Sequence, residues 1–127
     1  MEVVVTDEMD ERFIEFCKSF DCAVDDPQLV LLLTDYDNVV ACTSFKVFDS
    51  DSIEVFTLFV SSSRNQEEIS FKLIKQLEKI AIDFGFKNSY VYLDEDDLTF
   101  EIFKKLDYKV VENNKESLLK KEFRSLI

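Results

Sequence analysis

The feature that most constrains the fold is an apolar segment, residues 53–60, that leads through a polar loop into a long amphipathic helix. β-Branched and aromatic side chains predict a strand for that segment. The helix carries apolar residues every three or four positions, at Ile69, Leu73, Leu77, Ile80, Ala81 and Phe84. Asn65 followed by Glu68 predicts a capping box at its start. Gly85, the only glycine, predicts its end, because glycine readily adopts a left-handed backbone.

This junction is a candidate anion site. The first N–H groups of a helix have no partner within the helix, and its dipole directs positive charge outward. Residues 87–93 predict a strand after the helix. A strand, a helix and a second strand favour parallel pairing with a right-handed crossover.

The chain before residue 28 predicts a strand and a helix. Residues 3–6 are a β-branched run, and residues 11–18 carry apolar side chains at helical spacing. Thr6 or Asp7 is the expected N-cap. A turn at residues 25–27 is expected to end this part.

Three strands joined by short turns are expected next. Residues 28–34 are a continuous apolar run, and residues 39–48 return after turn residues at 35–38. A second turn at 49–52 leads to the strand at 53–60. The pattern predicts an antiparallel meander.

The C-terminal part predicts a helix and a hairpin. Acidic residues 94–97 are typical of a helix N-terminus, and apolar residues follow at Phe100, Phe103 and Leu106. Residues 108–112 and 117–123 predict two strands, and Asn113-Asn114 indicates the turn between them.

The net charge of −12, from 27 acidic and 15 basic residues, argues against a nucleic-acid partner. It is compatible with a cationic substrate or a basic protein surface. The chain has no histidine, which excludes Ser-His and Cys-His nucleophiles, and a zinc site would need Cys17, Cys22 and Cys42 together. We expect no metal. No run approaches the length of a membrane span and the N-terminus has no basic region, so we expect a cytoplasmic protein that does not bind membranes.

The order of strand, helix, meander, long helix, strand, helix and hairpin resembles the GNAT superfamily of acyl-coenzyme A-dependent N-acyltransferases. Residues 54–60 are similar to its central strand, residues 81–86 to the end of its main helix, residues 102–108 to its Leu-Tyr-x-Lys-x-Gly-Phe segment, and residues 118–123 to its closing strand. The resemblance implies an α/β (α+β) fold, with one domain over residues 1–127. A mixed, mostly antiparallel sheet is then flanked by helices.

The resemblance also implies acetyl-CoA as the cofactor. In that family the central strand and its neighbour splay apart around the pantetheine arm, and the loop before the long helix holds the pyrophosphate. The corresponding cofactor-binding residues here are Leu58, Phe59, Val60, Arg64, Asn65, Gln66, Glu67, Glu68, Ile69, Ser70 and Phe103.

Two departures from the family pattern bear on function. Gln66 and Glu68 stand where glycines are usual, and Glu67 with Glu68 would repel a pyrophosphate while stabilising a vacant helix N-terminus. Phe103 aligns with the tyrosine that often protonates the departing thiolate. Tyr108 is then a candidate acid, with the tyrosines at 90 and 92 as other sources of a hydroxyl.

Two hypotheses stay open. In the first, the chain is a divergent N-acetyltransferase in which Glu54 is the general base and a cationic amine attacks the thioester directly. In the second, it is an inactive GNAT-fold module, similar to the antizymes, that docks its acidic surface on a basic partner. A homodimer stays open as an assembly.

Overall fold

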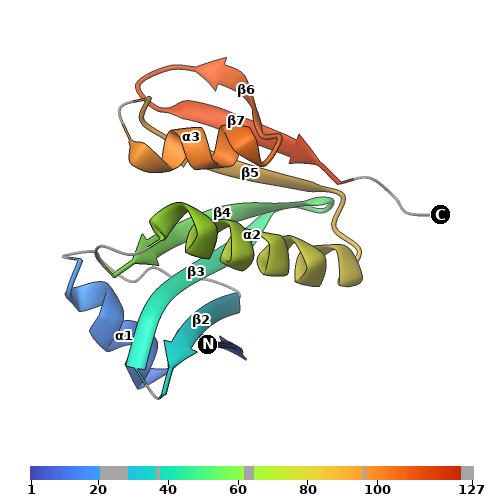
Figure 1. The fold of residues 1–127 in the computed structure, drawn as a ribbon. Coiled ribbons are helices and arrows are strands. Elements are labelled where there is room, and N and C mark those ends of the chain that lie inside the picture. Colours follow the sequence, from blue (N-terminus) through green and yellow to red (C-terminus); the bar gives the residue numbers. More distant parts are fainter. Residues whose placement is uncertain (21–28, 37, 62–64, 96, 124–127) are drawn as a thin grey trace.

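The computed structural model describes residues 1–20, 29–36, 38–61, 65–95 and 97–123, in which a seven-stranded sheet is flanked by three helices (Figure 1). The strands are β1 (Glu2–Thr6), β2 (Leu29–Asp35), β3 (Asn38–Asp49), β4 (Ser52–Val60), β5 (Asn88–Leu93), β6 (Lys109–Asn113) and β7 (Ser117–Glu122). The helices are α1 (Glu11–Lys18), α2 (Gln66–Asp83) and α3 (Leu98–Lys105).

The sheet order is β1-β2-β3-β4-β5-β7-β6, and only the β4–β5 pair is parallel. The meander of β2, β3 and β4, the parallel strands on either side of α2 and the β6–β7 hairpin are therefore confirmed. The mixed, mostly antiparallel single-domain fold expected from the sequence is confirmed as well.

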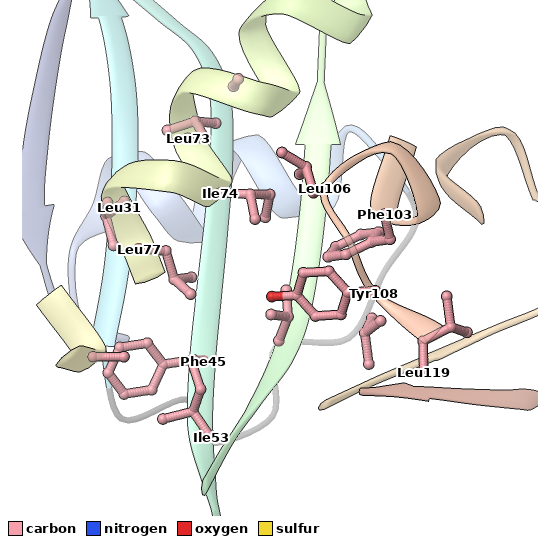
Figure 2. Packing of buried hydrophobic residues seen from close by; sticks show 14 of the residues in the cluster. Leu31, Phe45, Ile53, Leu73, Ile74, Leu77, Phe103, Leu106, Tyr108 and Leu119 are labelled. Carbon is pink, nitrogen blue, oxygen red and sulfur yellow. The ribbon is translucent and has the colours of Figure 1, made fainter. Parts of the chain in front are cut away.

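The two faces of the sheet are covered differently. Leu31 and Leu33 of β2 belong to a core cluster with α2 and α3, shown in Figure 2, whereas Val30 and Leu32 pack with Phe13 and other residues of α1. Because neighbouring residues of a strand point to opposite faces, α1 lies on the face opposite α2 and α3. Cys17 and Cys42 are buried in the cluster on the α1 side.

Strand β4 changes direction at a β-bulge. Ser44 pairs with Thr57 and Phe45 pairs with Val55, so Phe56 is the extra residue in β4. The parallel pairing of β4 with β5 covers only Ser52 to Glu54. Strand β4 therefore bends away from β5 just past Glu54, its last residue that pairs with β5.

Both ends of α2 lie where they are predicted, but the hydrogen bonds predicted at its start do not form. Gly85 has a φ of +94° and its N–H donates to the carbonyl of Ile82. At the other end, Asn65 is the N-cap but has a φ of 50° and no side-chain capping bond. A side-chain cap needs an extended backbone at this residue, so the predicted capping box with Glu68 does not form.

The predicted N-cap of α1 was also wrong. Asp10 caps this helix, and its carboxylate accepts a hydrogen bond of 2.9 Å from the backbone N–H of Arg12. Thr6 donates its hydroxyl to Asp10, and Asp7 accepts instead from the backbone of Met9. Both predicted caps are thus bonded within the turn that precedes the helix.

Some expectations fall outside the described residues: the turn at 25–27, Cys22, Arg64 and Asp96. None of the helices in the described ranges combines the length and the apolar character that crossing a membrane requires.

Candidate active site

A cleft of about 340 Å³ opens where β4 and β5 part. Its lining comes from both strands and from the start of α3: Val55, Phe56, Thr57, Leu58, Phe59, Val91, Tyr92, Leu93, Asp97, Thr99 and Phe103. Beyond Glu54, the backbone of β4 has no partner in β5. An extended ligand can therefore bond to this strand edge as a further strand would.

The lining of the cleft includes residues from both faces of the sheet. Val55 and Leu58 belong to the side of β4 that packs with α2, and Phe59 belongs to the α1 side. All three line the cleft.

Glu54 lies at the point where the two strands separate. It is half-buried and pairs across the sheet with Lys46 of β3 and Tyr90 of β5. Since its neighbours Ile53 and Val55 pack under α2, its own side chain is on the opposite face. Burial raises the pKa of Glu54, Lys46 opposes that shift, and Glu116 adds to it. A carboxylate with a raised pKa is a stronger base.

The predicted cofactor loop is divided between two sides of α2. Glu67 faces α3, where its carboxylate accepts a bond of 2.7 Å from Lys105 Nζ. Asn65, Glu68 and Ile69 instead line a separate pocket of about 420 Å³ beside β2 and β3. Gln66 is exposed and Ser70 is buried. The structure therefore does not bring all the predicted loop residues to one surface.

The Glu67–Lys105 ion pair joins the first turn of α2 to the last turn of α3. Glu67 raises the pKa of Lys105 through this bond. Both side chains are about half exposed, so the pair contributes little to stability. It does place one cation close to the N-terminus of α2.

Leu58, Phe59 and Phe103 are the predicted cofactor residues that line the cleft. Val60 lies at the end of the same strand and packs against the core under α2. Phe103 contacts the ring of Tyr108 edge-on, with 4.9 Å between ring centroids (Figure 2).

Tyr108, the candidate acid, lies in the core and not along the cleft. Its hydroxyl is 2.9 Å from Glu78 Oε2 and 2.8 Å from Ser89 Oγ. Burial, aided by Glu78, raises the pKa of Tyr108 well above its usual range. Its hydroxyl is therefore engaged in hydrogen bonds within the core and lies outside the cleft lining.

Sequence reasoning missed this polar group in the core. Glu78 is 6% exposed, and its second carboxylate oxygen accepts 2.8 Å from Lys121 Nζ. Its position was the available signal, because Glu78 shares the apolar stripe of α2 with Ile74, Leu77 and Ala81. An acid on such a stripe needs buried partners.

No metal site is apparent in the part of the chain that the structure describes, where no three metal-binding side chains gather. All buried side-chain nitrogen and oxygen atoms in that part have hydrogen-bond partners.

Comparisons with known proteins identify a family and several structures with a similar fold. Residues 2–102 match the model of the Acetyltransferase (GNAT) family. Aminoglycoside 6'-acetyltransferase type Ii has 19% identity and a TM-score of 0.80, over 96% of this chain and 97% of that one. The aminoglycoside 6'-N-acetyltransferase of Enterococcus faecium has 16% identity, a TM-score of 0.74 and the same coverage, 96% and 97%.

A third similar structure is the PaiA N-acetyltransferase of Thermoplasma acidophilum, solved in complex with coenzyme A. It has 13% identity and a TM-score of 0.72, over 97% of this chain and 100% of that one. At such identities the three structures show the fold alone. No curated protein sequence matches the chain significantly.

Proposed function

We propose, since this chain belongs to the acetyltransferase (GNAT) family, that it transfers an acetyl group from acetyl-CoA to a primary amine. The observation that carries the proposal is the splay of β4 and β5. Where these strands separate, three features occur together: a cleft with a mostly apolar lining, an unpaired edge of β4 and the half-buried carboxylate of Glu54. The apolar walls and free backbone groups fit an extended thioester arm.

In this mechanism Glu54 takes a proton from the acceptor ammonium, directly or through a water molecule. The bound cofactor supplies an activated thioester carbonyl. The amine nitrogen bonds to that carbon while the carbon–sulfur bond breaks, so no covalent bond to the protein forms. On the side that faces β5, the backbone of Leu58 to Val60 is unpaired. This strand edge holds the thioester arm in line with the amine.

As the amide forms, the attacking nitrogen would release its second proton and the leaving thiolate would take one up, and Phe103 has no group that can carry it. Tyr92 lines the cleft and is 44% exposed, so its side chain is accessible both to the cleft and to water. We assign the proton return to Tyr92, or to water that it orients.

The phosphate end of the cofactor meets a divided environment at α2. Glu67 and Glu68 in its first turn repel phosphate, and Lys105 attracts it. Phosphate bound there would compete with Glu67 for this lysine. We therefore expect an affinity that is weaker than with a glycine-rich loop and that falls with added salt.

Calorimetric titration with acetyl-CoA, followed by thiol release with a panel of amines, tests the proposal. We expect micromolar binding and turnover that Glu54→Gln lowers by about a hundredfold or more. Absence of binding at millimolar acetyl-CoA would exclude the enzyme and favour an inactive module. Binding without turnover on any amine would leave a cofactor-binding protein.

A further inference from the structure

The face of the sheet opposite α2 carries a row of polar and aromatic residues across four strands. Lys46 of β3 pairs with Glu54, Glu54 with Tyr90, and Tyr90 with Lys120 of β7. Directly paired residues point to the same face. The residues next to them, Phe45, Ile53, Val91 and Leu119, lie in the core on the other face, which confirms this orientation.

Aromatic rings surround Glu54 on this face. Phe48 of β3 and Tyr90 of β5 stack with 4.2 Å between their ring centroids, although β4 lies between their strands. Phe56, which lines the cleft, lies two residues beyond Glu54. The base thus faces a half-buried surface beside the opening of the cleft, where an acceptor amine would approach.

Lys46 is the neighbour of Glu54 across the sheet, but it forms no close ion pair within the described part of the chain. Its Nζ lies 4.5 Å from the centroid of the Phe56 ring, and among the described residues no carboxylate is within ion-pair distance of it. Lys120, in contrast, is 3.7 Å from Glu122. The ring fixes Lys46 beside the cleft and leaves its hydrogen-bond donors available.

The placement of this cation is informative because the chain as a whole carries a net charge of −12. A site for polycations would be expected to surround Glu54 with further acids. Glu116 is near enough to Glu54 to act on its charge, but the residue paired directly with Glu54 across the sheet is a lysine. This arrangement is complementary to a molecule with a positive and a negative group close together.

We propose that the acceptor is an amino acid or a similar small zwitterion, whose amine meets Glu54 and whose carboxylate binds Lys46. This inference rests on the proposed acetyl transfer and names its acceptor class. Paired residues on neighbouring strands have Cβ atoms about 5 Å apart. A short spacing between amine and carboxylate, as in α- to γ-amino acids, fits that distance.

Matched acceptors test the proposal, each amino acid compared with its own amide: glycine with glycinamide, and 4-aminobutanoate with 4-aminobutanamide. The variants are Lys46→Met, which keeps the apolar stem over Phe56, and Lys46→Arg, which keeps the charge. Lys79→Met, at an exposed position of α2, changes the net charge equally and is the control.

For the wild type and Lys79→Met, we expect the kcat/KM for the amino acid to exceed that for its amide. Lys46→Met should lower this ratio by roughly tenfold or more, because one charge-assisted bond to the amino acid alone is lost. Lys46→Arg should restore most of the ratio. A wild type without the preference, or an equal loss on both acceptors in Lys46→Met, would overturn the proposal.

Binding separates this inference from the proposed function. NMR titration of the wild type and Lys46→Met with 4-aminobutanoate and its amide needs no turnover. A carboxylate preference in the wild type that disappears in Lys46→Met supports the site even if no amine is acetylated. Equal binding of acid and amide by both proteins rejects the site even if acetyl transfer is observed.

Discussion

Replacing Tyr108 with phenylalanine should destabilise the protein and leave its chemistry intact. The hydroxyl bonds to Glu78 and Ser89, and Tyr108 is not among the residues that line the cleft. A residue that protonates a leaving thiolate would give the opposite result: a stable variant with a much lower kcat. One substitution therefore separates a structural role from a catalytic one.

The size of the effect follows from the partners that are left behind. Tyr108→Phe removes a bond to a carboxylate that is 6% exposed, and Glu78 then keeps only Lys121 on its other oxygen. A hydrogen bond to a buried charged group is worth about 1.5–3 kcal/mol. We expect the free energy of unfolding to fall by about 2 kcal/mol and Tm by roughly 6–10 °C.

The assay combines chemical denaturation with steady-state kinetics at a temperature where both proteins are folded. Tyr92→Phe is the matched control, because it removes the same atom from a side chain that is 44% exposed in the cleft. We expect Tyr92→Phe to keep full stability and to lose kcat, by about tenfold or more. A hundredfold lower kcat in Tyr108→Phe at unchanged stability would refute this reasoning.

Three further outcomes follow from the described contacts. The acid limb of the kcat/KM profile should lie above pH 4.5, the usual pKa of a glutamate, because burial raises the pKa of Glu54, and the limb should vanish in Glu54→Gln. Glu67→Gln should tighten acetyl-CoA binding by about two- to fivefold in calorimetry, since it removes a charge that repels phosphate from the N-terminus of α2 and releases the lysine of α3. Asp10→Ala should lower the free energy of unfolding by about 1 kcal/mol at pH 7. Because Arg12 holds the pKa of Asp10 well below its usual range, this difference should shrink as denaturation is repeated below about pH 4; a constant difference would contradict the ionic part of the cap.

Local patterns were sufficient to predict most of the fold. Three patterns each favour a single structure: the apolar run of β2, the helical periodicity of α2 and the glycine at position 85. The capping hydrogen bonds of α1 and α2 were not predictable in the same way. At α1 several side chains can cap and the turn geometry selects Asp10, whereas at α2 Asn65 is the cap residue but its backbone conformation prevents the side-chain bond.

The site was only partly predictable, because spacing along the chain does not show which side of a helix faces a cleft. The sequence placed Glu54 on the central strand, and the structure puts it where β4 and β5 separate. The same reasoning treated Asn65 to Ser70 as one surface, but Glu67 faces α3 whereas Asn65 and Glu68 line another pocket. Tyr108 was considered for its hydroxyl alone, and its burial depends on contacts with Glu78 and Ser89 that are distant in sequence.

Magnitudes bear on the choice between an enzyme and an inactive module. Each acid in the first turn of α2 disfavours a bound anion by about 0.3–1 kcal/mol. Glu67 and Glu68 together therefore weaken phosphate binding by at most about 2 kcal/mol, whereas micromolar affinity corresponds to about 8 kcal/mol. On these magnitudes the acidic turn would lower the affinity for acetyl-CoA without abolishing binding. Contacts along the cleft would then have to supply the larger share, and the separation of β4 and β5 leaves room for them.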